Sequence, residues 1–297
     1  MTGKLEAMLN EGRPILLDGG MGTSLYQAGI EPGVAPDEWN LTHPDVIRGI
    51  HRAYIEAGSQ VILTNTFGGS RFRLGFHNLG DRVTDVNRIG AQLARAEADA
   101  AGHEVLVAGS MGPTGELMEP YGVLTRTSAR DAFAEQAAAL VEGGVDLLWI
   151  ETMSDLDEVE AAVEAARDVC DLEVATTLSF ETRVHTMMGV SPAQAIERLR
   201  DLGLVAIGAN CGTGSPDVEK AIEAMRAVDS DVALIAKPNA GLPEHSNGEI
   251  VYSEGAPEMA EHARRLSDLG ASLIGGCCGS TPDHLRAMAV TLGIVSR

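Results

Sequence analysis

Eight short apolar runs alternate with helix-period segments along this sequence. The runs contain β-branched and aliphatic residues and span 15–18, 61–65, 105–110, 147–151, 174–179, 206–211, 233–237 and 273–277. Between them, apolar residues recur at offsets of three and four, as Leu156, Val159 and Val163 do, which places them on one helix face. Eight β-then-α units without a linker predict one α/β domain over residues 1–297, a single (β/α)8 TIM barrel. A doubly wound open sheet is the alternative.

The segments between the runs carry helix start and stop signals. A hydroxyl residue directly before proline suits a helix start, because the missing N–H of proline would be unpaired there anyway. Such pairs are Ser191-Pro192, Ser215-Pro216 and Thr281-Pro282, and Asp155 and Thr42 are further candidate caps. Glycine favours the left-handed turn that ends a helix, and we expect this at Gly58, Gly144, Gly203 and Gly270.

Composition disfavours several classes of protein. The chain has 22 Lys and Arg against 43 Asp and Glu, a formal net charge of −21, which repels nucleic acids and anionic lipid surfaces. No apolar stretch approaches the roughly 20 residues that span a membrane, and the first ten residues lack the apolar core of a signal peptide. Four unevenly spaced cysteines do not resemble a disulfide framework. These features predict a soluble, cytoplasmic protein.

Three cysteines at predicted strand ends indicate a metal site. Cys277 and Cys278 are adjacent, so they could bind one ion only where the strand ends and the chain turns, which the flanking glycines allow. Cys211 would add a third soft ligand and leave one position open on tetrahedral Zn²⁺. The alternatives are buried apolar cysteines or a vicinal disulfide. Cys170 ends a helical segment and belongs to the opposite face of the barrel.

Other polar residues also stand at the ends of the predicted strands. The carboxyl ends of barrel strands converge on one face, where active sites lie. These end residues are Asp18, Thr64, Asn65, Ser110, Glu151, Ser179, Asn210, Lys237 and Asn239, and the long segments 21–38 and 66–82 are expected to cover the same face. The sequence therefore predicts an active site that combines thiols with carboxylates.

At these residues the sequence resembles the homocysteine S-methyltransferase family. The resemblance rests on two cysteine motifs, Asn210-Cys211-Gly212 and Gly275-Gly276-Cys277-Cys278-Gly279, and on weaker matches at 17–23, 64–67, 112–115, 151–152 and 238–241. It implies a zinc-dependent methyltransferase that makes methionine, with Zn²⁺ on Cys211, Cys277 and Cys278 and the homocysteine sulfur as fourth ligand. It also implies that Asp18 and Glu151 hold the substrate ammonium. The turns at Gly19-Gly20 and Ser110-Met111-Gly112 could present N–H groups to the substrate carboxylate.

The prediction of the methyl donor rests on positions where this sequence differs from some members of the family. Betaine-using relatives carry tyrosine directly after the acid that matches Glu151, and this chain has Thr152 there. The remaining motifs resemble the methionine synthase module, which favours a methyl-corrinoid donor such as methylcobalamin, held by a separate corrinoid protein. The alternative is a small onium donor, betaine, S-methylmethionine or another sulfonium. Candidate donor-side residues are Trp39, Phe67, Phe72 and Asn210, with Tyr26 as a further aromatic.

Two alternative functions would each require a histidine in the site. In a cysteine hydrolase, His185 or His245 would activate a strand-end thiol, although neither histidine has a position that specifies such a pair. In a non-catalytic zinc-binding barrel, His284 would close the site as a fourth protein ligand, although a residue this early in a helix is expected to face solvent.

Overall fold

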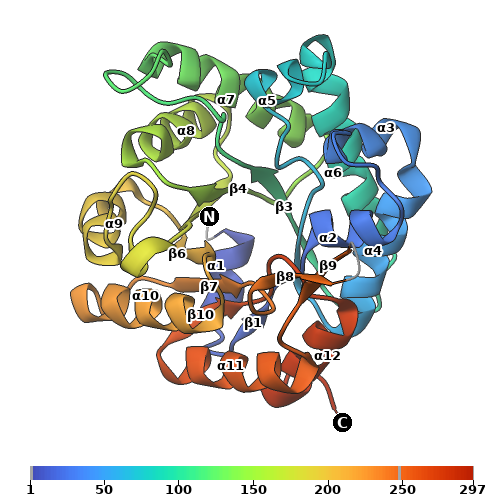
Figure 1. The fold of residues 1–297 in the computed structure, drawn as a ribbon, viewed down its shortest axis with the longest axis vertical. Coiled ribbons are helices and arrows are strands. Elements are labelled where there is room, and N and C mark those ends of the chain that lie inside the picture. Colours follow the sequence, from blue (N-terminus) through green and yellow to red (C-terminus); the bar gives the residue numbers. More distant parts are fainter. Residues whose placement is uncertain (1–2, 247–248, 297) are drawn as a thin grey trace.

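The computed structural model describes residues 3–246 and 249–296 and contains a closed parallel sheet. The strands follow the order β1, β10, β7, β6, β5, β4, β3 and β2, and a parallel bridge between Leu17 and Val61 joins the last strand to the first. They are β1 (Ile15–Leu16), β2 (Val61–Leu63), β3 (Leu106–Met111), β4 (Leu147–Met153), β5 (Glu173–Leu178), β6 (Ala206–Cys211), β7 (Leu234–Pro238) and β10 (Ala271–Ile274). Figure 1 shows a ring of helices around these strands. The predicted (β/α)8 barrel is confirmed.

Eight helices form the outer ring. They are α4 (Pro44–Ala57), α6 (Val83–Asp99), α7 (Arg126–Glu142), α8 (Leu156–Val169), α9 (Pro192–Leu199), α10 (Ser215–Val228), α11 (Ala256–Asp268) and α12 (Pro282–Thr291). Shorter elements lie in the connections: α2 (Met21–Gln27), α3 (Trp39–Thr42), α5 (Arg71–Gly75), η1 (Pro36–Glu38), η2 (Gly80–Arg82), η3 (Thr182–Val184) and η4 (Arg200–Leu202). In the part of the chain that the structure describes, no helix combines the length and apolar character needed to cross a bilayer.

Two apolar layers hold the barrel together. The inner layer fills the barrel with alternate residues of the strands, such as Ile15, Leu147 and Trp149, all buried. The amino-terminal helix α1 (Lys4–Leu9) closes the amino end of the barrel, where Leu5 joins this layer and the N–H of Leu5 donates to the Glu173 carboxylate at 2.8 Å. The outer layer lies between strands and helices and includes the remaining strand residues.

Most predicted helix ends are confirmed. Ser191 caps α9 in a capping box, Asp155 caps α8, and Thr281 is the N-cap of α12. All four glycines named above have positive φ, between 66° and 114°. Two predicted caps are wrong. Ser215 is the first residue of α10, whose N-cap is Gly214, and Thr42 is the last residue of α3, so that His43 caps α4.

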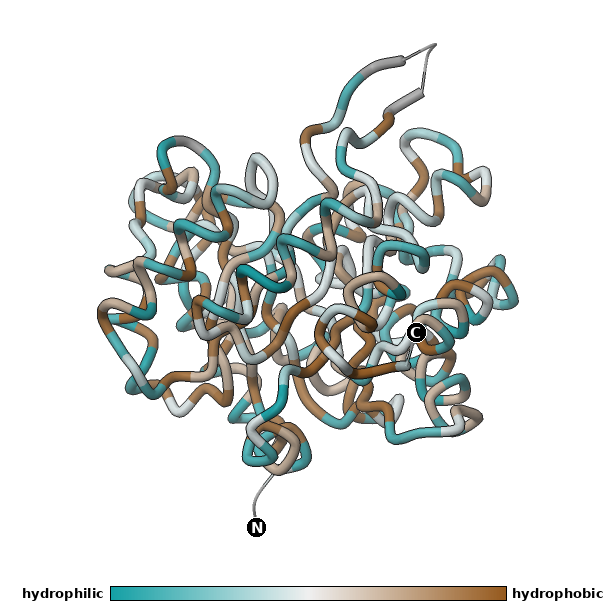
Figure 2. The backbone as a smooth tube through the Cα atoms, turned by 90° about the horizontal axis from the view of Figure 1, so that it is seen from below, coloured by the Kyte–Doolittle hydropathy of each residue, from teal (hydrophilic) through white to brown (hydrophobic). Residues whose placement is uncertain are grey.

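The carboxyl end of the barrel carries the long connections. Both the 21–38 and 66–82 segments lie there with their short helices, as predicted. An antiparallel hairpin of β8 (Pro243–Ser246) and β9 (Glu249–Tyr252) follows β7 and was not expected from the sequence. In the side view of Figure 2, the chain's amino terminus lies at one end of the barrel and a hairpin projects from the other.

Candidate active site

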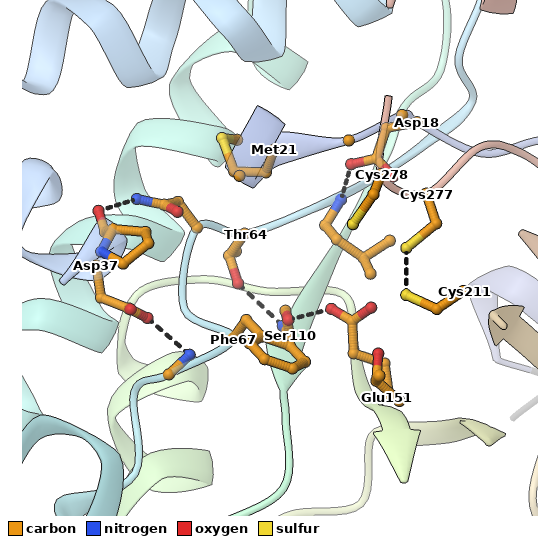
Figure 3. Close-up of a pocket in the computed structure, with 18 of the residues that line it drawn as sticks. Asp18, Met21, Asp37, Thr64, Phe67, Ser110, Glu151, Cys211, Cys277 and Cys278 are labelled. Carbon is orange, nitrogen blue, oxygen red and sulfur yellow. Dashed lines mark hydrogen bonds between the residues drawn. The ribbon is translucent and has the colours of Figure 1, made fainter. Parts of the chain in front are cut away.

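A cavity of about 250 Å³ opens at the carboxyl end of the barrel (Figure 3). Strand ends form its inner part, and the loops after β1 and β2 form its outer part. The residues singled out from the sequence that line it are Asp18, Gly19, Gly20, Thr64, Asn65, Phe67, Ser110, Glu151, Thr152, Lys237, Cys211, Cys277 and Cys278. The structure therefore brings the predicted thiols and carboxylates into one space.

The three cysteine sulfurs form a compact cluster. The Sγ atoms of Cys211 and Cys277 are 2.8 Å apart, and one sulfur from each of Cys211, Cys277 and Cys278 fits within 4.8 Å of the others. Figure 3 shows the side chains converging from two segments on the same wall of the cavity. The described cysteines are free, so no vicinal disulfide forms.

Local backbone geometry produces this cluster. Cys211 ends β6 with a φ of 57°, a left-handed conformation that turns its side chain out of the strand alternation. Strand β10 ends at Ile274, three residues before the predicted end, so Cys277 and Cys278 lie on an irregular segment. There the Cys277 N–H donates to the Pro238 carbonyl at 2.7 Å, and the Cys278 carbonyl accepts from the Ala240 N–H at 2.9 Å. The turn expected for adjacent thiols that share one ion is present.

The cluster fits a zinc ion by geometry and donor type. Tetrahedral zinc with Zn–S bonds of about 2.3 Å places its ligand sulfurs about 3.8 Å apart, within the span of this cluster. Hydrogen bonds from Cys211 and Cys277 lower the pKa of the Cys278 thiol. The hydrogen bonds with Cys277 and Cys278, together with burial, raise the pKa of Cys211. All three cysteines line the cavity, so the fourth position of a zinc ion held there would be open to a substrate.

Asn210 supports the cysteines from behind and does not line the cavity. Its Nδ2 lies 3.5 Å from the Cys211 sulfur and 3.8 Å from the Cys277 sulfur, and it donates to Thr152 Oγ1 at 2.6 Å. The N–H of Thr152 in turn donates to Asn210 Oδ1 at 3.0 Å. The amide of Asn210 is therefore directed at the thiols, and a donor-side role for this residue stays a prediction.

Asp18 forms an ion pair with Lys237, a residue for which the sequence predicted only a position at a strand end. Lys237 Nζ lies 2.6 Å from Asp18 Oδ1, and both side chains are at most 4% exposed. The other oxygen, Asp18 Oδ2, accepts the Leu63 N–H at 2.7 Å. Burial alone would lower the pKa of Lys237, but the carboxylates of Asp18 and Glu151 raise it above its ordinary value. The lysine is therefore charged.

Glu151 is the second carboxylate of the inner cavity. Its Oε1 accepts a hydrogen bond from the Ser110 hydroxyl. Desolvation raises the pKa of Glu151 to about 7, while Lys237 and the Ser110 hydrogen bond oppose that shift. Near neutral pH this carboxyl is poised between its acid and its anion, and Ser110 orients it.

The backbone amides predicted for the substrate carboxylate are largely occupied. The Ser110 N–H donates to Thr64 Oγ1 at 2.9 Å, and the Gly112 N–H donates to the Phe67 carbonyl at 3.1 Å. The Gly20 N–H faces the Ser280 carbonyl at 3.4 Å. The scaffold thus holds the amides of Ser110, Gly112 and Gly20, and binding of the substrate carboxylate at these two turns stays a prediction.

The candidate aromatic residues are divided between the cavity and the core. Phe67 lines the cavity. Trp39 is buried with Leu25 and Ile30 under the first loop and stacks on His43, with ring centroids 4.2 Å apart. Phe72 packs partly buried against the main core. Among these three donor-side candidates only Phe67 lines the cavity, because Trp39 and Phe72 pack in apolar clusters.

The histidine alternatives do not match the structure. His284 is partly buried, with Nδ1 accepting the Thr281 N–H at 3.1 Å and Nε2 3.0 Å from the Glu254 carbonyl, so it neither faces solvent nor closes the cluster. His185 is exposed and does not line the cavity. The His245 side chain lies outside what the structure describes. Cys170 follows α8 and is absent from the cavity wall, as predicted.

The fold and site define a barrel enzyme with a three-thiol cluster beside carboxylates. A family model described as homocysteine S-methyltransferase matches residues 15–292. The chain belongs to this family, as the sequence resemblance indicated.

The chain is also similar to individual relatives, and it shares its fold with a solved structure. The chain is 33% identical over 297 residues to methionine synthase of Mycobacterium leprae, covering 94% of this chain and 24% of that protein. It is likewise 33% identical over 302 residues to methionine synthase of Mycobacterium tuberculosis, covering 96% and 25%. The metallated form of the Escherichia coli homocysteine methyltransferase MmuM shares the fold, with a TM-score of 0.81 and 24% identity over 96% of this chain and 98% of that one. The chain spans about a quarter of the length of the curated relatives it matches.

Proposed function

We propose that residues 1–297 act as one domain that transfers a methyl group to the thiol of homocysteine with the help of zinc, giving methionine. The observation that carries this proposal is the placement of three cysteine sulfurs beside Glu151 in one cavity. Homocysteine has a thiol at one end and an ammonium and a carboxylate at the other. A cavity with a metal-binding cluster and a carboxylate complements the first two groups.

Each residue has a defined task in this proposal. Cys211, Cys277 and Cys278 would hold Zn²⁺, which supplies Lewis acidity that lowers the pKa of the substrate thiol. Asn210 holds two of the cysteine sulfurs in place by hydrogen bonding. Glu151 binds the substrate ammonium, oriented by Ser110. In the reaction, the homocysteine sulfur forms a bond to the methyl carbon while the bond between that carbon and the donor breaks. The electron pair of the broken bond stays with the donor.

We propose a methyl-corrinoid, carried by a separate protein, as the donor. The surface around the cavity supports a macromolecular partner. Within the described parts of the chain, every exposed large hydrophobic residue lies in a segment that follows a barrel strand at its carboxyl end, where the cavity opens. They are Tyr26, Phe76, Leu117, Tyr121, Val123, Met187, Leu242 and Val251, referred to below as the mouth residues. Exposed apolar side chains in the loops around the cavity are suited to contact with a protein partner.

A small onium donor is the second candidate. Phe67 and the buried carboxyl of Asp37 both line the outer cavity, and the Gly68 N–H donates to Asp37 Oδ1 at 3.0 Å. A sulfonium or quaternary ammonium could lie between an aromatic face and a carboxylate. One aromatic ring gives a weaker site than a full cage, and for this reason we place the onium donor second.

The site of action follows from the thiols. Four free cysteines, three of them in a metal-binding cluster, require a reducing compartment, and we propose the cytoplasm.

One assay tests the proposal. Zinc-loaded protein is given homocysteine together with methylcobalamin, a methyl-corrinoid protein, betaine or S-methylmethionine in separate reactions, and methionine is measured. We expect the fastest formation with the corrinoid protein. Faster turnover with an onium donor would replace the donor assignment, and no methionine with any donor would reject the proposed function.

A further inference from the structure

Two permanent cations line the cavity in the described parts of the chain. Arg73 comes from the loop after β2 and faces Asp37 in the outer part. Lys237 comes from the end of β7 and lies near Asp18, Glu151 and Cys277 in the inner part. Lys237 is thus the cation next to the thiol cluster, where the proposed function places the substrate.

The Asp18–Lys237 pair combines a fixed anion with an adjustable cation. Asp18 is fixed on both sides, because one oxygen accepts the Leu63 N–H at 2.7 Å and the other is 2.6 Å from Lys237 Nζ. Lys237 has a flexible four-carbon stem with a hydrogen-bonding ammonium at its end. Both residues are buried yet contribute to the cavity wall.

An amino acid has the same two charges on one carbon. We infer that Lys237 binds the α-carboxylate of homocysteine, while Asp18 and Glu151 bind its α-ammonium, so that the two charges of the substrate pair with the three charges of these side chains. This inference rests on homocysteine as the acceptor, and it makes Lys237 a specificity-determining residue.

Two features of the cavity support this role. A carboxylate entering the inner part meets Asp18, Glu151 and the thiol cluster, so an uncompensated anion there would be strongly repelled. Two of the alternative donors are occupied, because the N–H groups of Ser110 and Gly112 already bond within the scaffold. A lysine ammonium has three N–H donors, so Lys237 can keep one bond to Asp18 and still bind the substrate carboxylate.

Two truncated homocysteines test the inference by calorimetry on zinc-loaded protein. The analogue 3-aminopropane-1-thiol lacks the carboxylate, and 4-sulfanylbutanoic acid lacks the ammonium. In Lys237→Met we expect homocysteine and 4-sulfanylbutanoic acid to bind about 10- to 100-fold more weakly, as expected for a lost charge-assisted contact. Binding of 3-aminopropane-1-thiol should not weaken by more than about threefold, since it has no carboxylate for Lys237 to recognise and its ammonium loses a competing cation.

Controls separate recognition from a scaffold role. Arg73→Met removes the other cavity cation and should leave the preference for homocysteine over 3-aminopropane-1-thiol unchanged. Lys237→Arg should keep most of that preference. If Lys237→Met does not fold, the charge-neutral double variant Asp18→Asn with Lys237→Met removes both partners and is measured in its place, with the same loss of carboxylate recognition expected.

The outcomes are distinct. If Lys237→Met weakens homocysteine and 3-aminopropane-1-thiol equally, or weakens neither, Lys237 does not bind the carboxylate and the inference is overturned. If the wild-type protein binds neither homocysteine nor the analogues, the proposed function fails and the inference falls with it.

Discussion

The Ser110 hydroxyl donates a hydrogen bond to the Glu151 carboxylate across the ends of β3 and β4. This contact favours the carboxylate anion against the desolvation that raises its pKa to about 7. Because Ser110 N–H is itself fixed to Thr64 Oγ1 at 2.9 Å, the hydroxyl is held in position by the scaffold. The pair therefore provides an oriented carboxylate whose charge depends on pH near neutrality.

The first prediction concerns the Glu151 charge. Glu151→Gln keeps the shape of the side chain but removes the anion, so homocysteine should bind about 10- to 100-fold more weakly, the effect of losing a charge-assisted contact of about 1.5–3 kcal/mol. Zinc content should stay unchanged, because Glu151 is outside the thiol cluster. Titration calorimetry and metal analysis of the same sample measure both. Equal homocysteine affinity in variant and wild type would assign Glu151 to the scaffold.

The second prediction is the pH dependence of the same contact. Glu151 in the free protein takes up a proton as the pH falls through about 7, and the neutral acid no longer attracts an ammonium. Homocysteine affinity should therefore fall as the pH is lowered below about 7. Glu151→Gln should lose this component and retain only the dependence due to the thiol. Parallel affinity–pH curves for the two proteins would contradict the assignment.

The third prediction concerns stability. Burial raises the pKa of Asp37 from its ordinary 3.8 to about 6, so the folded protein favours the protonated acid and loses stability as the pH rises through about 6. Asp37→Asn is neutral throughout. The stability of wild type relative to this variant should therefore fall by about 1 to 2 kcal/mol between about pH 5 and about pH 8. Urea denaturation at both pH values measures the change, and a difference that does not vary with pH would show that Asp37 is not desolvated.

The fourth prediction concerns the mouth residues. Tyr121→Ser together with Val123→Ser removes two of the most exposed apolar side chains of the loop after β3. Methyl transfer from a corrinoid protein should slow, while transfer from free methylcobalamin should not, because neither residue lines the cavity. Steady-state rates with the two donors give the comparison. Equal slowing with both donors would indicate damage to the site itself.

The barrel and the thiol cluster could be predicted because their signals are local. Each strand is a short apolar run, and Cys277 and Cys278 are flanked by glycines that permit the observed turn. The Asp18–Lys237 pair could not be predicted in the same way, since its partners are 219 positions apart and meet only after the sheet closes. The one signal was a lysine at the end of an otherwise apolar run.

The positions of the loop aromatics, the extra hairpin and the Asn210 amide could not be predicted from the sequence, each for its own physical reason. From the sequence alone, an aromatic residue in a loop could belong to a ligand cage or to a small apolar core. In the structure, Trp39 belongs to such a core and is buried with Leu25 under the first loop. The hairpin of β8 and β9 was missed because its strands pair with each other and are not part of the barrel sheet. Asn210 lies at the end of a strand as predicted, but its amide faces the cysteine sulfurs and not the cavity.

Zinc content of the cysteine variants tests the ligand set. Cys211→Ala, Cys277→Ala and Cys278→Ala should each lose most of the metal while the barrel stays folded, because the two apolar layers do not involve the cluster. Cys170→Ala is the matched control and should keep both zinc and activity, since this thiol follows α8 outside the cavity. Full zinc content in the Cys277→Ala protein would remove Cys277 from the ligand set.

The central claim is that the three cysteines bind zinc and that the homocysteine sulfur takes the open fourth position. X-ray absorption at the zinc edge, before and after addition of homocysteine, counts the sulfur neighbours of the metal directly. The account predicts an increase from three sulfurs at about 2.3 Å to four. A count that stays at three, with homocysteine bound by calorimetry, would contradict activation of the substrate thiol at this cluster.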